Sequence, residues 1–416
     1  MTMVSLPKHF IRVAASNEMS SAAYALQNAE ALMVSQPYAL KMRNSLGSTI
    51  EANGKPFLID PETYRYFFPR KYHLKQKKPR AWLHEMAQLM PDEIKTTFGI
   101  KKAEPSNFDA LQLIDFCKAN IEIQTSLKKS DGTSLLPLAI LCPYMLIGEE
   151  NFSGSIQFHL QIIKTMLKVN KTGLPVIAYL YLSNELLNRP SRLEKIADAL
   201  KEVECKAVAV WIDNFDETAA NDDELENLKE FYLQLSASKH VLSMYGGTAQ
   251  IMMMYHGLGS ITHGVHYQLH KNGKNEGGGP AHYFYISNLR HRIRTIEAST
   301  IIERQGFSRP EYLNKVCNCP VCEKEISYAP GAAILSLEGN SGDQVGKLTT
   351  HFSYCKKVEI DNVARLTMGE YAEWLNVMTD HLQLTLDEED YVDTVNNWIS
   401  VIFGIDLEEQ ADDEAI

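Results

Sequence analysis

Three cysteines lie within six residues of one another late in the chain, in the pattern Cys317-x-Cys319-x-x-Cys322. Zinc prefers thiolate and imidazole ligands in a tetrahedron, and a short turn with this spacing can direct three sulfur atoms toward one point. The segment KLTTHFSYCKK offers His351 and, one helical turn further on, Cys355 on the same face. The sequence therefore predicts a metal site with three ligands from the turn and two candidates for the fourth.

A site of this kind is expected to be structural. Four protein ligands leave no open position for water, so the ion stabilises the fold and does not catalyse a reaction. The chain has seven cysteines, and crowded thiols indicate metal binding more often than a disulfide framework. Free buried thiols are the alternative. Zinc is inferred from the ligand types, because iron can also occupy thiolate sites.

Carboxylates close two of the apolar runs in the chain. Asp60 ends KPFLID and Asp213 ends KAVAVWID. A carboxylate at such a position can act as a nucleophile or can move a proton, although Asp213 could equally cap a helix or lie in a loop. Other residues near the ends of apolar runs are candidates for substrate binding, and structural burial is the alternative for the two histidines. These candidates are Tyr245, Gly246, Gly247, His263 and His266.

The elements that would position these residues alternate between strand and helix. Near-continuous apolar runs are typical of parallel strands that are covered on both faces, and segments with helical spacing separate them. This alternation predicts an α/β fold, a (β/α)8 TIM-like barrel with a zinc-binding insertion and C-terminal helices, with a doubly wound sheet as the alternative. In a barrel the chemistry lies at the carboxyl ends of the strands. The predicted strands are 55–60, 136–147, 174–183, 206–213, 240–246 and 260–267.

The chain divides into three predicted regions. Residues 1–300 form the barrel body, 301–360 form a zinc-binding subdomain that closes the barrel, and 361–416 contain C-terminal helices and an acidic tail. Hydrophobic residues make up 45% of the 416 residues and charged residues 22%, which is ordinary for a globular protein. No run is long enough to span a bilayer, and the N-terminal residues lack the apolar core of a signal peptide. We therefore expect a cytoplasmic protein without membrane association.

The net charge of −11 is concentrated at the C-terminal end. Eleven Asp and Glu residues and no Lys or Arg follow from Asp387 onward, so the remaining chain has 41 acidic and 41 basic residues. Two basic clusters could contact phosphates or could form solvated faces. The first comprises Arg70, Lys71, Lys75, Lys77, Lys78 and Arg80; the second comprises Arg290, Arg292 and Arg294.

The cysteine pattern, followed at a distance by His351, resembles the zinc signature of the tRNA-guanine transglycosylase superfamily. The segment KPFLIDPETYRYFF is similar to that family's catalytic strand, with Asp60 retained and Pro61, Glu62 and Thr63 in place of glycines. The stretch HVLSMYGGTAQIMMMYHGLGSITHGVHYQLHKNG resembles the family's strand, helix and strand that lead to its nucleophile. The resemblance covers roughly residues 50 to 360, and it favours His351 as the fourth zinc ligand.

The resemblance implies base exchange on a nucleic acid, in which guanine is replaced by a 7-deazaguanine base in tRNA or DNA. An Asp attacks the ribose C1′, and a second carboxyl group moves a proton on and off the base. A target base must also leave its stack to enter the pocket, which favours aromatic residues at the rim, unless these residues are core. The candidates for this rim are Tyr64, Tyr66, Phe67, Phe68, Tyr72 and Trp82.

One departure from the family bears on the mechanism. Where the family places its nucleophilic Asp, this chain has GSITHGVHYQ, which contains no carboxylate. Asp213 is then the candidate for a relocated nucleophile beside Asp60. The alternatives are a non-catalytic nucleic-acid-binding or partner subunit, in a homo- or hetero-oligomer, and an unrelated zinc-containing barrel that acts on a small molecule.

Overall fold

A computed structural model describes residues 6–14, 16–67, 90–92, 95–96, 99–100, 102–264, 282–339 and 341–405. His266, the first basic cluster and the acidic end beyond residue 405 lie outside these residues, as do the rim candidates Phe68, Tyr72 and Trp82.

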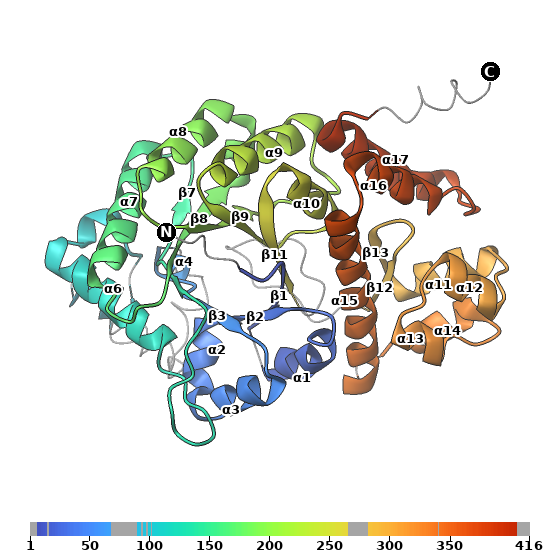
Figure 1. Ribbon diagram of the computed structural model, residues 1–416, viewed down its shortest axis with the longest axis horizontal. Coiled ribbons are helices and arrows are strands. Elements are labelled where there is room, and N and C mark those ends of the chain that lie inside the picture. Colours follow the sequence, from blue (N-terminus) through green and yellow to red (C-terminus); the bar gives the residue numbers. More distant parts are fainter. Residues whose placement is uncertain are drawn as a thin grey trace.

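The N-terminal two thirds of the chain form a parallel α/β barrel (Figure 1). One sheet has the strand order β3-β2-β1-β11-β10-β9-β8-β6, and the short strand β7 also pairs with β8. Because β6 and β7 share one position, the nine strands occupy eight positions. The edge strands approach each other, since the Leu138 amide donates to the Phe57 carbonyl at 2.9 Å. The predicted TIM-like barrel is confirmed, and the doubly wound sheet is wrong.

The strands are β1 (His9–Val13), β2 (Ala31–Ser35), β3 (Phe57–Asp60), β6 (Ile140–Leu141), β7 (Leu146–Ile147), β8 (Val176–Ser183), β9 (Ala207–Asp213), β10 (His240–Met244) and β11 (Leu258–Gly264). Strands β1 and β2 are not among the predicted strands. The single strand predicted at 136–147 is divided into the two short strands β6 and β7. The pair β4 (Lys95–Thr96) and β5 (Gly99–Ile100) is antiparallel and separate from the barrel.

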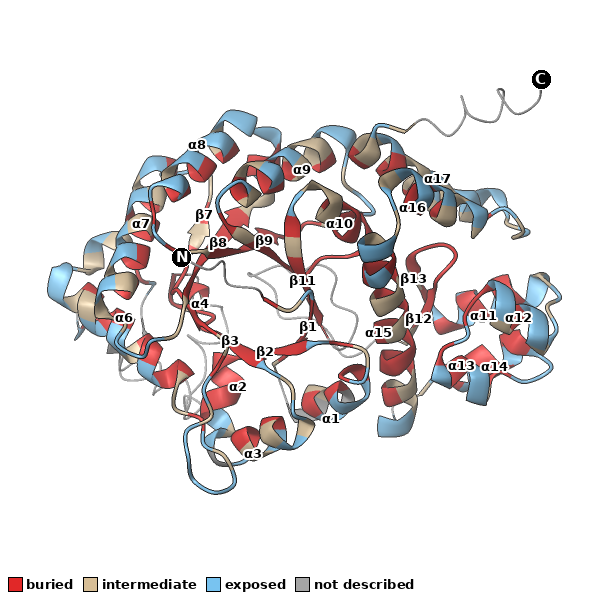
Figure 2. Cartoon of the chain, in the orientation of Figure 1, coloured by how far each residue is buried: buried red, intermediate tan, exposed pale blue. Residues whose placement is uncertain are grey.

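Alternate residues of each strand divide between two apolar layers. Phe10, Leu58 and Trp211 belong to the cluster inside the barrel, whereas Ile11 and Ile59 pack against the surrounding helices. Burial is nearly complete along the strands, and the helices bury only their inner faces (Figure 2). The helices of this layer are α1 (Ser16–Ala25), α2 (Gln36–Lys41), α3 (Arg43–Asn53), α4 (Tyr64–Phe67), α6 (Ala110–Gln124), α7 (Phe152–Val169), α8 (Pro190–Lys201), α9 (Asp222–Ser236) and α10 (Thr248–Met252).

The C-terminal part of the described chain begins with a hairpin and continues as helices. Helix α15 stands between the barrel and the elements from β12 to α14 (Figure 1), with contacts to α1 and α10 on the barrel side and to α13 and β12 on the other. The elements are β12 (Tyr283–Ile286), β13 (His291–Arg294), α11 (Thr295–Arg304), α12 (Arg309–Lys315), α13 (Pro320–Glu325), α14 (Pro330–Ser336), α15 (Gly342–Arg365), α16 (Met368–Val377) and α17 (Leu386–Trp398). Short 3-10 turns cover Pro105–Asn107, Asn184–Asn188 and Met253–His256, and a π turn covers Ile399–Phe403.

The apolar cluster around the cysteines runs from Phe284 to Cys355. It therefore includes the hairpin and the start of α11, which the sequence analysis assigns to the barrel body. Among the described residues, none of the helices has both the length and the apolar character that a membrane crossing requires.

Candidate active site and metal centre

Asp60 lies at the carboxyl end of β3 and points into the barrel, on the same side of the strand as Leu58. The Tyr144 hydroxyl donates to Asp60 Oδ1 at 2.8 Å, and the Glu62 amide donates to the same oxygen at 3.1 Å. Arg12 donates to Asp60 Oδ2 from Nε at 3.3 Å and from Nη2 at 3.2 Å. Both carboxylate oxygens of this buried residue are thus hydrogen-bonded.

Arg12 joins two carboxylates that lie two residues apart in sequence. Its Nη2 atom also binds Glu62 Oε1, and the other oxygen of Glu62 accepts from Arg65 Nε at 2.6 Å. Arg12, Asp60 and Glu62 are all at most 3% exposed. A buried ion pair of this kind requires hydrogen bonds to offset the cost of removing its charges from water, and each member here has them.

The turn after β3 directs Glu62 back toward Arg12. Glu62 has a φ of 46°, in the left-handed region that non-glycine residues seldom adopt. Thr63 holds the next position, since its hydroxyl donates to the Tyr144 carbonyl at 2.7 Å and accepts from the Tyr144 amide at 2.6 Å. Strained backbone of this type is frequent at functional sites. The segment Pro61-Glu62-Thr63 therefore places a second carboxylate beside Asp60.

Aromatic side chains fill the barrel around this carboxylate pair. The Tyr144 and Tyr179 rings stack with centroids 3.7 Å apart, and Tyr181 and Trp211 stack at 3.9 Å. Tyr64 contacts both pairs. The Tyr179 hydroxyl is buried without a hydrogen-bond partner among the described residues. These stacked rings make a planar-faced, mostly apolar interior next to the carboxylates.

Burial sets the protonation of the tyrosines in this region. It raises the pKa of Tyr144 well above the ordinary value, and the nearby Asp60 carboxylate raises it further. Burial likewise raises the pKa of Tyr245 well above its ordinary value, although Arg12 opposes the shift. Both phenols are therefore neutral at physiological pH, and Tyr144 can donate to Asp60.

The predicted residues Tyr245, Gly246 and Gly247 follow β10 at the carboxyl end of the barrel. Tyr245 has a φ of 62°, and Arg12 lies 5.4 Å from its ring centroid. A Cβ at Gly247 would approach Glu217 Oε1 to 2.0 Å. The structure therefore brings Tyr245 to the carboxylate pair, while Gly247 allows a buried carboxylate to approach the chain closely.

Asp213 is buried at the end of β9 and shares the inward side of that strand with Trp211. In the strand order, β6 and β8 lie between β3 and β9, so Asp213 and Asp60 end strands that are not neighbours. The polar partners of Asp60 are Arg12, Glu62 and Tyr144. A catalytic role for Asp213 stays a prediction.

His263 lies on the outer side of β11. Its Nε2 atom is 3.0 Å from Nε2 of His9, and its ring meets Phe352 of α15 edge-on. Burial lowers the pKa of His263 well below its ordinary value, so the ring is neutral. These contacts place His263 between the barrel wall and α15, and its predicted role in substrate binding has no further support.

Three polar residues of the site are not predicted as functional from the sequence, namely Arg12, Glu62 and Tyr144. Arg12 offers a signal, because a charged residue stands in the apolar run HFIRVA with the alternation of an inward-facing position. Glu62 and Tyr144 offer none, since their positions depend on a turn and on the pairing of distant strands.

The cysteine turn and α15 bring four metal-binding groups together, namely Cys317, Cys319, Cys322 and His351, all buried. The His351 Nδ1 atom lies 3.5 Å from Cys317 Sγ and 3.4 Å from the sulfur atoms of Cys319 and Cys322. Bond lengths of about 2.3 Å to sulfur and about 2.05 Å to nitrogen give ligand separations of about 3.6 Å in a zinc tetrahedron. The cluster therefore could bind a metal ion, and its dimensions are compatible with zinc.

The orientation of His351 distinguishes it from Cys355. His351 Nε2 lies 2.7 Å from the carbonyl oxygen of Tyr285, so Nε2 carries the hydrogen and Nδ1 presents its lone pair to the three sulfur atoms. Cys355 Sγ is 3.8 Å from Cys317 Sγ but lies beside Nε2 of His351, at 4.0 Å. The geometry favours His351 as the fourth ligand.

Local structure fixes the cysteine turn. Cys319 caps α13, with Pro320 at the first helical position and the Cys322 amide donating to Cys319 Sγ at 3.3 Å. The Tyr312 hydroxyl lies 3.5 Å from Cys322 Sγ. Hydrogen bonds to thiolates orient them toward a metal ion.

A scan against models of protein families finds none that matches this chain, and no curated protein is significantly similar to it. The resemblance to the transglycosylase superfamily therefore rests on the residues of this chain alone.

Proposed function

We propose that this protein exchanges guanine in DNA or tRNA for a 7-deazaguanine base through a carboxylate-dependent mechanism, and that its Cys3His cluster holds a structural zinc ion. The observation that carries the proposal is the pair of carboxylates at the carboxyl end of β3. Asp60 and Glu62 share Arg12, and the same end of the barrel carries aromatic rings. An enzyme of this class requires two carboxyl groups in one place, and Glu62 satisfies that requirement better than Asp213.

The proposed roles follow from position. A carboxylate oxygen of Asp60 attacks C1′ of the target nucleotide, the N-glycosidic bond breaks, and its electron pair passes to the departing guanine. The carboxylate of Glu62 relays a proton from solvent to guanine as it leaves and then removes the corresponding proton from the incoming base. That base then displaces Asp60 from C1′. Arg12 orients both carboxylates, so it is a positioning residue.

The remaining features support a nucleobase as the reacting group. Stacked tyrosine and tryptophan rings accept planar bases on their faces.

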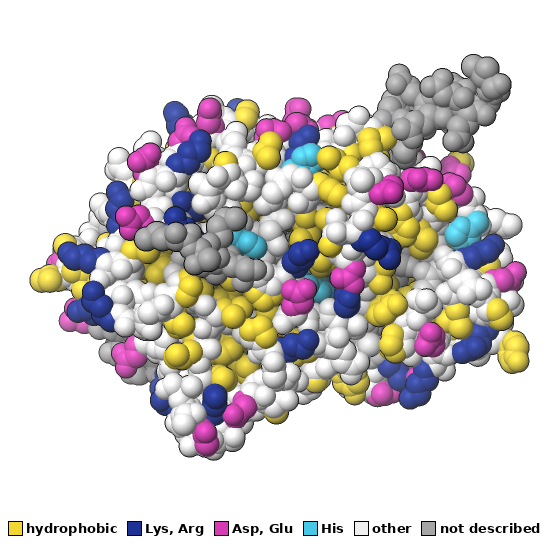
Figure 3. Space-filling model, viewed as in Figure 1, with side chains coloured by type: hydrophobic (Ala, Val, Ile, Leu, Met, Phe, Trp, Pro, Cys, Tyr) yellow, Lys and Arg dark blue, Asp and Glu magenta, His cyan; other side chains and the backbone are white. Residues whose placement is uncertain are grey.

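Figure 3 shows basic and acidic side chains mixed on the face that it draws. The described residues of this face therefore form no continuous basic surface that would attract a polyanion.

The proposed zinc ion has a supporting role only. Its ligands come from the cysteine turn and from α15, and α15 also packs against α1 and α10 of the barrel. When bound, the ion crosslinks the C-terminal subdomain to a helix of the barrel interface. No step of the base exchange passes through it, because a closed Cys3His set leaves no position for substrate.

The test is mass spectrometry of nucleosides from DNA or tRNA incubated with the zinc-loaded protein and a 7-deazaguanine base. Asp60→Asn should abolish incorporation, and Glu62→Gln should lower the rate by about 100-fold or more, the usual effect of removing a general acid. Asp198→Asn, at an exposed position on α8, is the matched control and should retain wild-type activity. Full activity of Asp60→Asn would remove that residue from the mechanism.

Asp213→Asn separates the two candidates for the second carboxylate. Loss of activity in Asp213→Asn together with normal activity in Glu62→Gln would assign the second role to Asp213 and would contradict the present assignment.

One observation favours the alternative of a non-catalytic nucleic-acid-binding or partner subunit. Both oxygens of Asp60 are engaged by Arg12, Tyr144 and the Glu62 amide, as in a purely structural ion pair. A folded, zinc-loaded protein that binds the nucleic acid without incorporating any base would support this alternative.

A further inference from the structure

Arg290 occupies an unusual position in the turn between β12 and β13. It is 3% exposed, has a φ of 56°, and places its guanidinium 4.2 Å from the ring centroid of Trp374. Its Nε and Nη2 atoms have no hydrogen-bond partner among the described residues. A buried guanidinium with two unpaired donors is costly, so the arrangement calls for a partner that the described side chains do not supply.

The unpaired atoms lie on one edge of the guanidinium. Nε and Nη2 project in parallel and match two oxygens of a carboxylate or phosphate group, whereas Nη1 faces Glu359 at 3.5 Å. Glu359 does not neutralise Arg290 fully, because Lys356 also binds it, at 3.0 Å. The cluster therefore has two cations and one carboxylate, and the Nε and Nη2 edge of Arg290 is buried without an anionic partner among the described residues.

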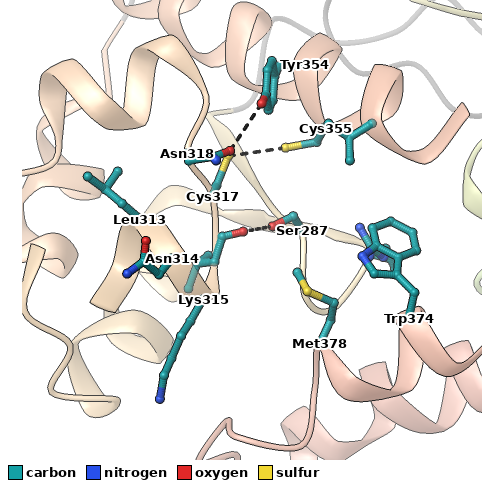
Figure 4. A pocket seen from close by; sticks show the side chains of 13 residues that line it. Ser287, Leu313, Asn314, Lys315, Cys317, Asn318, Tyr354, Cys355, Trp374 and Met378 are labelled. Carbon is teal, nitrogen blue, oxygen red and sulfur yellow. Dashed lines mark hydrogen bonds between the residues drawn. The ribbon is translucent and has the colours of Figure 1, made fainter. Parts of the chain in front are cut away.

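Arg290 lines a pocket of about 150 Å³ beside the metal ligands. The pocket has a buried floor that includes Ser287 and Cys317 and an exposed rim that includes Lys315 and Asn318. Figure 4 shows residues of β12–β13, α12, α15 and α16 converging on this space. None of its thirteen lining residues is acidic.

We propose that this pocket binds a phosphate group, held by the Nε and Nη2 edge of Arg290. The fork of a guanidinium can bind two phosphate oxygens at once, and Glu359, the carboxylate that pairs with Arg290, contacts the opposite side of the guanidinium at Nη1 and is not among the lining residues. The proposal does not depend on base exchange in the barrel. The phosphate belongs either to a nucleic acid backbone or to a small free anion, and the test separates these sources.

The test is calorimetric titration of the full, metal-loaded chain with inorganic phosphate. Arg290→Met should weaken binding by about tenfold or more, as expected for the loss of charge-assisted hydrogen bonds. Arg294→Met, at an exposed position of the same hairpin, removes the same charge and should leave binding unchanged. Equal binding by wild type and Arg290→Met, or no binding of millimolar phosphate by wild type, would overturn the proposal.

A second variant keeps the proposal testable if Arg290→Met does not fold. Arg290→Lys keeps the positive charge without the two-pronged edge and should weaken phosphate binding about two- to fivefold. Unchanged binding by this variant would then count against the pocket. A competition experiment distinguishes the two sources of the phosphate group. An unmodified single-stranded oligonucleotide should compete with inorganic phosphate if the pocket binds the nucleic acid backbone, and it should not compete if the pocket binds a small free anion. A competing oligonucleotide that binds Arg290→Met as tightly as wild type would contradict the assignment of the backbone phosphate to this pocket.

Discussion

His351 and Cys355 lie one turn apart on α15, and only the imidazole directs a lone pair at the three cysteine sulfur atoms. Spacing alone leaves the two candidates equal, because both lie on one face of the same helix. The difference depends on the Tyr285 carbonyl, which fixes the ring through Nε2 at 2.7 Å. That contact joins residues 66 positions apart and is beyond what local sequence can indicate.

The ligand set predicts the metal content of two variants. His351→Ala should lose most of its bound metal, since removing one of four ligands opens the coordination shell, whereas Cys355→Ser should retain one ion per chain. The measurement is elemental analysis of protein purified and dialysed without chelator. Metal loss in Cys355→Ser with full retention in His351→Ala would assign the fourth ligand to Cys355.

The stability of the protein should depend on pH because the carboxyl group of Glu217 is buried. Burial raises its pKa to about 7 although Lys356 opposes the shift, whereas an unfolded chain has the ordinary value near 4.5. Between these two values the folded protein binds one proton more than the unfolded protein, so its free energy of unfolding falls as pH rises. The fall is about 3 kcal/mol by pH 8, at about 1.36 kcal/mol for each pKa unit.

Urea unfolding of wild type and Glu217→Gln at pH 5 and pH 8 measures this effect. The variant cannot titrate at this position and should gain about 2.5 kcal/mol relative to wild type on going from pH 5 to pH 8, because pH 5 already lies above the pKa of the unfolded chain. Glu230→Gln, at an exposed position of α9, is the control for the change of charge. Parallel profiles for wild type and Glu217→Gln would show that residue 217 does not carry the pH dependence.

At the scale of elements, α15 docks the C-terminal subdomain on the barrel through a buried polar network. Lys356 donates to Thr248 at 2.7 Å and to the Tyr285 hydroxyl at 2.9 Å. Glu359 accepts from Tyr285 at 2.6 Å. Burial alone would raise the pKa of Glu359, but Lys356 and Arg290 hold it below the ordinary value, so the residue is charged.

Removing Glu359 should therefore be costly. Glu359→Ala leaves two buried cations without their carboxylate and should lower the free energy of unfolding by about 3–5 kcal/mol. Lys356→Met should lower the free energy of unfolding less in the Glu359→Ala variant than in wild type, and the difference, the coupling energy, should be about 1–3 kcal/mol. Denaturant titrations of the single and double variants give both values. Asp361→Ala, which breaks an exposed pair on the same helix, is the control and should cost under about 1 kcal/mol. Additive effects of the two substitutions would show that Lys356 and Glu359 act independently.

The predictability of the elements depended on their length and composition. The long runs that form β8 and β9 are apolar throughout and were visible from the sequence. β1 and β2 are not predicted because Arg12 interrupts the apolar run of β1, and because β2 continues without a loop into α2. A short strand with polar inward-facing residues cannot be distinguished from a loop by its local sequence alone.

At the scale of the whole molecule, the three cysteines and His351 lie in an apolar cluster of the C-terminal unit from β12 to α15, whereas α16 and α17 contribute buried residues to the cluster of the barrel. Chelation of the proposed zinc ion should therefore release the C-terminal unit before the barrel. Hydrogen exchange should accelerate in α12, α13 and α14 and remain slow in β8, β9 and β10. As the control, added Zn²⁺ should return the exchange rates of α12, α13 and α14 to those before chelation. Unchanged protection of α13 after complete metal removal would show that no metal stabilises this unit.

The barrel and the three cysteines of the turn could be predicted from the sequence because each leaves a periodic or closely spaced signal, whereas the preference for His351 over Cys355 depended on the family resemblance. The second carboxylate could not, because Glu62 reaches Asp60 only through a turn of positive φ and a shared arginine from β1. That carboxylate pair is the link between the fold and the proposed chemistry.

Nucleoside mass spectrometry tests the proposed chemistry most directly. DNA and tRNA are incubated separately with wild-type, zinc-loaded protein and a 7-deazaguanine base, and the modified nucleoside and the released guanine are both quantified. The account predicts that one polymer gains the 7-deazaguanine nucleoside and releases guanine in equal amount. Absence of both products from either polymer, with protein shown to be folded and metal-loaded, would contradict the claim that this barrel catalyses base exchange.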